Sequence, residues 1–83
     1  MEAKKIIITG AATRIGASIA KSLANFDVKI LLHYNKSSLE VKKLKIDLEN
    51  LGAEIFLIKA DLNKSTEVKK IIPYAYKVMR GID

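Results

Sequence analysis

The sequence is short and mixed in composition: it has 83 residues, 49% of them hydrophobic and 29% charged, with a net charge of +6, one proline and no cysteine. This length fits one small domain or part of a larger one, and the apolar fraction excludes a disordered tail. The lack of cysteine excludes a disulfide framework, a thiolate zinc site and a cysteine nucleophile, and it fits a reducing compartment. No secretory signal or run of about 20 apolar residues is visible, so we expect a cytoplasmic protein with no membrane partner.

The first half of the chain predicts two strands separated by a helix. Residues 4–9 (KKIIIT) are a β-branched run, typical of a strand that is buried on both faces. Residues 14–25 (RIGASIAKSLAN) carry large apolar residues at every fourth position, which predicts a helix with one apolar stripe. The stripe consists of Ile15, Ile19 and Leu23, with Ala20 and Ala24 beside them. Residues 28–34 (VKILLHY) predict the second strand, and polar turn residues follow it.

The second half begins with another predicted helix. Either Ser37 or Ser38 can cap it, and Gly52 stands where a left-handed residue would end it. Its apolar residues at helical spacing are Val41, Leu44, Leu48 and Leu51. Residues 54–59 (EIFLIK) then predict a third strand.

A third helix is expected after this strand, capped by Asn63 or Ser65. Its apolar residues are Val68, Ile71, Ile72 and Ala75. Pro73 lies inside it and predicts a kink or a restart near Ile72, because a mid-helix proline removes a backbone donor and clashes with the preceding turn. The order of elements is βαβαβα with short connections, which predicts an α/β fold with parallel strands. The third predicted helix leads to no further predicted strand, so we expect only part of a larger parallel sheet.

In an open parallel sheet, ligands bind beyond the carboxyl ends of the strands, and three turns of this chain should meet there. These turns are residues 9–16, 33–38 and 60–63. In the first, Gly10 permits a tight turn and Gly16 permits close packing of the helix on the strand. Backbone N–H groups and the positive end of the helix then point at one place, as a phosphate site requires. An ordinary turn stays open as the alternative, because two glycines alone are a weak signal.

Residues 9–16 (TGAATRIG) resemble the T-G-x-x-x-G-x-G loop of the short-chain dehydrogenase/reductase family, with Arg14 in place of the middle glycine. That replacement, together with the His33–Tyr34 pair at the end of the second strand, is similar to the pteridine-reductase-like branch. Residues 60–62 (ADL) resemble the family's loop after strand three, and residues 81–83 (GID) resemble the approach to strand four. The resemblance covers essentially the whole chain.

The resemblance implies that residues 1–83 form a partial NAD(P)-binding Rossmann domain, its N-terminal βαβαβα half, truncated before strand four. Rossmann folds that prefer NAD place a carboxylate after the second strand to hold the ribose 2′-hydroxyl, and residues 33–39 contain none. Lys36 and nearby hydroxyls would bind a 2′-phosphate, and Arg14 would add a second cation, so the expected cofactor is NADP(H). The predicted cofactor-binding residues are Gly10, Arg14, Ile15, Gly16, His33, Tyr34, Asn35, Lys36, Ser37, Asp61 and Leu62. The resemblance implies that Asp61 accepts a hydrogen bond from the adenine amine.

The family's chemistry needs a tyrosine, a lysine four residues after it and a serine, which the resemblance places beyond a fourth strand. No tyrosine of this sequence has a lysine four residues later. The nearest pattern, Tyr76 and Arg80, precedes strand four and lies in the wrong part of the fold. We therefore predict no catalytic residue and no metal site, and we expect a cofactor-binding fragment or remnant that is inactive alone.

Two other classes of function stay open. The sequence pI of about 9.7 is also typical of a module that binds nucleic acid, although no such motif is present and no nucleic-acid partner is expected. An interaction module would use the edge of the first strand, left open by the missing fourth strand, and self-association through this edge is expected. Four predicted site residues also have plainer alternatives: Arg14 and Lys36 as solvated surface, His33 as a strand-end residue and Asp61 as a helix-start residue.

Overall fold

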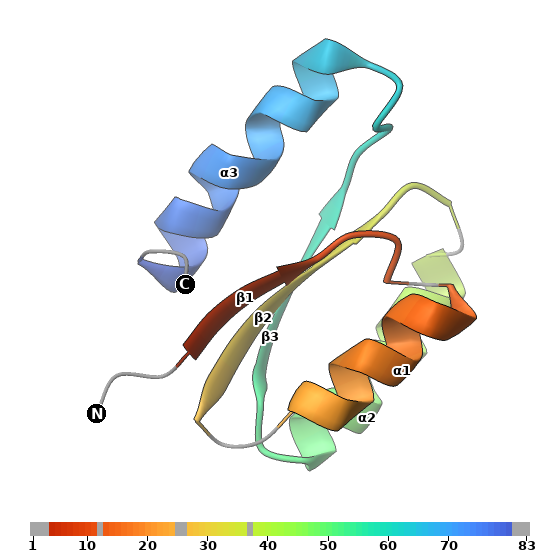
Figure 1. The fold of residues 1–83 in the computed structure, drawn as a ribbon, viewed down its shortest axis with the longest axis vertical. Helices are drawn as coiled ribbons and strands as arrows, with labels where there is room; N and C mark the ends of the chain where they lie inside the picture. The colour runs from red at the N-terminus through yellow and green to blue at the C-terminus, as the bar shows by residue number, and fades with distance from the viewer. Residues whose placement is uncertain (1–3, 12, 25–26, 37, 81–83) are drawn as a thin grey trace.

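The structure is a computed structural model that describes residues 4–11, 13–24, 27–36 and 38–80. Within these residues, strands and helices alternate along the chain (Figure 1). The elements are β1 (Lys4–Ile8), α1 (Arg14–Leu23), β2 (Val28–Tyr34), α2 (Ser38–Asn50), β3 (Glu54–Lys59) and α3 (Ser65–Met79). The predicted α/β fold with the order βαβαβα is confirmed.

The three strands form a parallel sheet in which β2 is central and β1 and β3 lie on either side. In this register Ile6 lies opposite Ile30. Within the described residues β1 has a strand neighbour on one side only, so it is an edge strand. The expectation that residues 4–9 are buried on both faces is therefore wrong in part: Ile6 and Ile7 are only half-buried, and the strand ends at Ile8.

Helices cover both faces of the sheet and give the fold three layers, with α1 and α2 on one side and α3 on the other (Figure 1). The side chains of β2 alternate between the two layers. Ile30 and Leu32 belong to the core cluster under α1 and α2, whereas Leu31 packs with residues of α3. All three are fully buried, which explains the consecutive apolar residues at the centre of β2.

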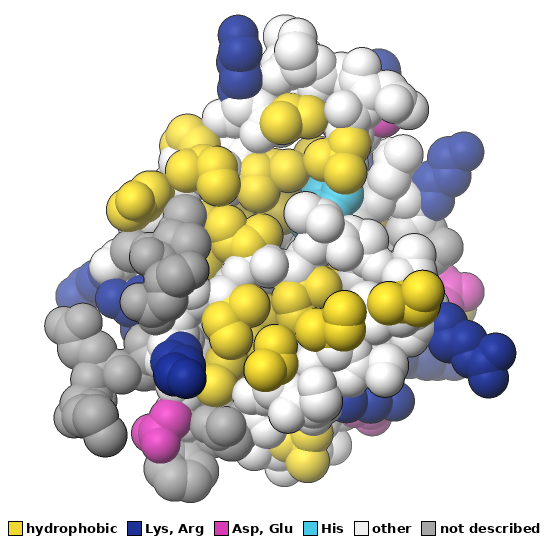
Figure 2. Space-filling model, viewed as in Figure 1, with side chains coloured by type: hydrophobic (Ala, Val, Ile, Leu, Met, Phe, Trp, Pro, Cys, Tyr) yellow, Lys and Arg dark blue, Asp and Glu magenta, His cyan; other side chains and the backbone are white. Residues whose placement is uncertain are grey.

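The buried face of α1 is made of small residues, not of the apolar stripe that the sequence predicts. Gly16 and Ala20 are buried, whereas Ile15, Ile19 and Leu23 are 75%, 46% and 39% exposed. The helix lies too close to the preceding turn for larger residues, because a Cβ on Gly16 would meet a backbone oxygen of that turn at 2.4 Å. Hydrophobic side chains therefore gather on the outer surface of α1, on the face of the molecule that carries the β1 edge (Figure 2).

α2 follows its predicted pattern except at its ends. Its core residues Val41, Leu44 and Leu48 are buried as expected, but Leu51 lies beyond the helix and is half-exposed. Ser38 is the first helical residue, and Ser37 lies outside the described residues. Gly52 has a φ of +99°, so the predicted left-handed stop is confirmed.

α3 begins without the predicted cap. The N-cap position is Lys64, whose side chain makes no capping hydrogen bond, so neither Asn63 nor Ser65 has the expected role. Pro73 lies inside one continuous helix, and the predicted restart is therefore wrong. The proline is tolerated because the carbonyl that loses its partner belongs to Lys69, which is exposed and can bind water there.

Candidate functional site

A pocket of about 310 Å³ opens at the carboxyl ends of the strands. Parallel strands end at the same edge of the sheet, so the turns after them meet there, as the topology predicts. The lining residues are Gly10 and Thr13 after β1, His33, Tyr34, Asn35 and Lys36 at the end of β2, and Asp61, Leu62 and Asn63 after β3.

The turn between β1 and α1 is held by Gly10 and Thr13. Gly10 has a φ of +61°, in the left-handed region that favours glycine. Thr13 is the N-cap of α1: its Oγ1 accepts a hydrogen bond from the Gly16 N–H at 3.0 Å and donates one to the Gly10 carbonyl at 2.7 Å. The first turn of α1 contains no acidic residue. The positive end of the helix is therefore open to an anion without a competing carboxylate.

His33 forms a buried wall of the pocket and is only 2% exposed. Its Nδ1 lies 3.3 Å from the Gly10 N–H, and its Nε2 lies 2.7 Å from the Ala60 carbonyl. Its own carbonyl accepts a hydrogen bond from the Ala11 N–H at 2.9 Å. His33 therefore ties together the ends of all three strands, which goes beyond the plain role of a strand-end residue.

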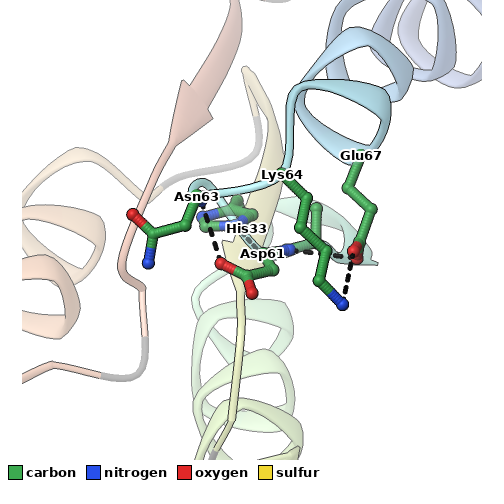
Figure 3. Close-up of polar contacts among 6 residues, drawn as sticks. His33, Asp61, Asn63, Lys64 and Glu67 are labelled. Carbon is green, nitrogen blue, oxygen red and sulfur yellow. Dashed lines mark hydrogen bonds and ion pairs between the residues drawn. The ribbon is translucent and has the colours of Figure 1, made fainter.

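Asp61 organises the connection from β3 to α3 (Figure 3). Its Oδ1 accepts a hydrogen bond from the Asn63 N–H at 2.9 Å, and its own N–H donates to Glu67 Oε1 at 3.1 Å. Glu67 also forms an ion pair with Lys64 at 3.7 Å. These contacts replace a side-chain cap at the start of α3, and they hold Asp61 and Asn63 at the pocket wall.

Most of the predicted cofactor-binding residues line this pocket, but three of those that the structure describes do not. Arg14 and Ile15 are exposed at the start of α1, and Gly16 is buried beneath the turn. Ser37 lies outside the described residues. Lys36 is exposed on the pocket wall, where the sequence predicts a cation.

Two lining residues, Thr13 and Asn63, were not among the predicted cofactor-binding residues. The signal for Thr13 is its position directly before an amphipathic helix, where threonine is a favoured N-cap. The signal for Asn63 is its spacing from Asp61, because an aspartate commonly binds the backbone N–H two residues on.

The described part of the chain contains neither a cluster of metal ligands nor a membrane-spanning helix. No group of three or more His, Asp or Glu side chains there is placed to hold a metal ion. No helix there has the length and hydropathy to cross a membrane.

Comparisons with known proteins give the same fold. The family model described as short chain dehydrogenase matches residues 4–83. The short chain dehydrogenase claC of Passalora fulva is 27% identical over 83 residues, which cover 100% of this chain and 31% of that protein.

Two solved structures match over nearly the whole chain. The crystal structure of a short-chain dehydrogenase from Oenococcus oeni has a TM-score of 0.88 and 35% identity, covering 99% of this chain and 38% of that one. A short chain dehydrogenase from Burkholderia cenocepacia, in complex with NADP, has a TM-score of 0.89 and 29% identity, covering 99% of this chain and 34% of that one. The chain thus spans about a third of the length of these relatives.

Proposed function

Because the chain belongs to the short-chain dehydrogenase family, we propose that its pocket binds the adenosine and pyrophosphate end of NADP(H). The observation that carries the proposal is the meeting, in one pocket, of the Gly10 turn and Lys36. The first N–H groups of a helix have no partner within the helix, and Arg14 and Ile15 supply two of them beside this turn. These N–H groups and the helix dipole suit the pyrophosphate. Arg14 and Ile15 are therefore proposed to bind the cofactor through their backbone N–H groups.

Lys36 supports a preference for NADP(H) over NAD(H). It lies on the pocket wall directly after β2, where folds that bind NAD carry a carboxylate for the ribose hydroxyls. A lysine there attracts a 2′-phosphate, whereas a carboxylate would repel it. A structurally similar short chain dehydrogenase has been crystallised with NADP, which supports the same class of cofactor. We propose that Asp61, which also lines the pocket, accepts a hydrogen bond from the adenine amine, and that Ser37 adds a hydroxyl.

Replacing Lys36 by alanine is expected to weaken NADP+ binding about tenfold and to leave NAD+ binding nearly unchanged, because the lost charge faces only the 2′-phosphate. The measurement is calorimetric titration of wild type and variant with both nucleotides. Lys42→Ala is the matched control, since it removes the same charge from an exposed position of α2 that does not line the pocket.

The same titrations with single-stranded DNA test the main alternative. DNA binding that weakens steeply with salt, in the absence of any NADP+ binding, would replace the proposed function by nucleic-acid recognition. Equal loss of NADP+ affinity in both lysine variants would show that net charge, and not the pocket, attracts the ligand.

We propose that residues 1–83 alone bind the nucleotide without transferring hydride, because no tyrosine in the sequence is followed by a lysine four residues later. Membership of the pteridine-reductase-like branch stays part of the proposal and rests on Arg14 and the His33–Tyr34 pair. A cytoplasmic location is also proposed, and fractionation of cells that express a tagged chain tests it.

The open edge of β1 supports a second proposal, that two copies of the chain associate through it. Within the described residues β1 pairs with β2 alone, and Figure 2 shows hydrophobic side chains over α1 and α3 on this face. The exposed apolar residues of these helices are Ile15, Ile19 and Leu23 on α1 and Val68, Ile72 and Tyr76 on α3. An antiparallel pairing centred on Ile6 would set Lys4 opposite Ile8 of the second copy, so like charges would not face each other.

Sedimentation velocity over a range of protein concentrations is expected to show a reversible dimer that Ile19→Lys disrupts, because the new charge replaces an exposed apolar side chain of α1. Ile46→Lys is the control, since Ile46 is also exposed but lies on α2, which packs over β2 and β3. A wild-type chain that stays monomeric at every concentration would exclude this association.

A further inference from the structure

His33 is the only buried polar or charged side chain among the described residues, and the proposed cofactor contacts leave its ring without a role. Both ring nitrogens have partners inside the protein: the Gly10 N–H at Nδ1 and the Ala60 carbonyl at Nε2. The ring therefore offers no nitrogen to a ligand. Its effect on the site must act through the backbone that it holds.

The two contacts determine the protonation state of the ring. The Ala60 carbonyl can only accept a hydrogen bond, so Nε2 must carry a hydrogen. The Gly10 N–H can only donate, so Nδ1 must present a lone pair. Two independent contacts thus require the same form, the neutral imidazole with its hydrogen on Nε2.

Gly10 is held on both of its backbone groups. His33 accepts from its N–H, and Thr13 donates to its carbonyl through both Oγ1 and N at 2.7 and 3.0 Å. Its left-handed backbone, with a φ of +61°, thus lies between a strand-end histidine and the N-cap of α1. A change at His33 therefore reaches the proposed pyrophosphate turn directly.

We propose that His33 is a positioning residue: as a neutral imidazole it holds the Gly10 turn in the shape that accepts the pyrophosphate. A side chain that cannot accept from the Gly10 N–H would leave this turn without its anchor at the end of β2. This inference rests on the proposed function of the pocket.

The test compares three variants by their NADP+ affinity at neutral pH. His33→Phe removes both ring contacts and is expected to lose about tenfold in affinity. His33→Asn places an amide oxygen where Nδ1 lies, and it is expected to restore most of that loss. His33→Gln reaches toward Ala60 instead and should restore less.

Rescue by the conservative variant separates positioning from simple stability. His33→Asn is expected to bind NADP+ more tightly than His33→Phe when both are folded, because only the amide can still accept from the Gly10 N–H. Equal affinities of these two folded variants, or full affinity in a folded His33→Phe variant, would overturn the proposal.

NMR of the free chain keeps the test independent of ligand binding. The ring nitrogens of His33 are expected to show the neutral form with hydrogen on Nε2, and the Gly10 amide is expected to shift in His33→Phe. Hydrogen on Nδ1, or a Gly10 amide that is unchanged in His33→Phe, would also overturn the proposal. If both signatures appear but no NADP+ binds, the proposed function fails while the coupling between His33 and the turn stands.

Discussion

Replacing Gly16 by alanine is expected to destabilise the chain by about 2–3 kcal/mol and to abolish nucleotide binding. A Cβ on Gly16 would lie 2.4 Å from the Gly10 carbonyl oxygen and 3.0 Å from the Ala11 Cα. Both neighbours are backbone atoms, so neither can rotate away as a side chain would. The turn must move as a whole, and this displaces the backbone that we propose for the pyrophosphate.

Urea unfolding and NADP+ titration of the same variant measure the two effects. Ser18→Ala is the matched control, because it changes an exposed residue of the same helix and is expected to alter stability by less than about 0.5 kcal/mol. A Gly16→Ala chain that unfolds at the wild-type midpoint and still binds would contradict the close approach of α1 to the turn.

Leu32→Ala is expected to cost about 3 kcal/mol, and Ile15→Ala less than about 0.5 kcal/mol, although both remove a large apolar side chain. Leu32 is fully buried in the central strand, whereas Ile15 is 75% exposed on α1. A chain of this size is expected to be stable by only about 4–12 kcal/mol, so the first change removes a large share of its stability. Thermal unfolding should show a fall in Tm of more than about 10 °C for Leu32→Ala alone.

The contrast between these two substitutions tests which face of α1 packs on the sheet. The apolar stripe in the sequence predicts that Ile15 contributes to the core, and the structure predicts that it does not. Comparable losses of stability in the two variants, measured in dilute solution to exclude association, would favour the stripe. Such a result would mean that α1 is rotated about its axis relative to the structure.

The sequence predicts the order of the elements and the place of the site because both depend on local patterns. Consecutive apolar residues such as 30–32 mark strands that are covered on both faces, and Gly10 and Gly52 stand where the backbone turns with a positive φ. Parallel topology then brings the turns after the strands together without further information. The fold class and the pocket between these turns follow from these patterns.

Other features depend on which neighbour a residue meets, and periodicity does not contain that information. The stripe through Ile15 has helical spacing, yet the close approach at Gly16 places the small residues inward. The start of α3 is held by a hydrogen bond between Asp61 and Glu67, which lie six residues apart, and not by a local cap. The role of His33 needs a carbonyl 27 residues away, so only the folded structure could show it.

These observations divide the proposed site into two functional parts. We propose that the Gly10 turn and the N-terminus of α1 supply backbone groups for the pyrophosphate, and that Lys36 after β2 supplies the charge that separates NADP(H) from NAD(H). The two parts come from different turns and are joined through His33. Substitutions at the turn should therefore weaken both nucleotides, and substitutions at Lys36 should change the preference between them.

The most direct test of the central claim is an NMR titration of the isotopically labelled chain with adenosine 2′,5′-bisphosphate, the part of NADP(H) that carries the 2′-phosphate. The expected result is saturable chemical-shift changes confined to the three turns, strongest at Lys36, Asn35, Asp61 and Asn63. Lysines on the outer faces of α2 and α3, such as Lys42 and Lys69, should not respond. Shifts spread over these lysines, or no shifts at the turns, would contradict the assignment of this pocket to the nucleotide.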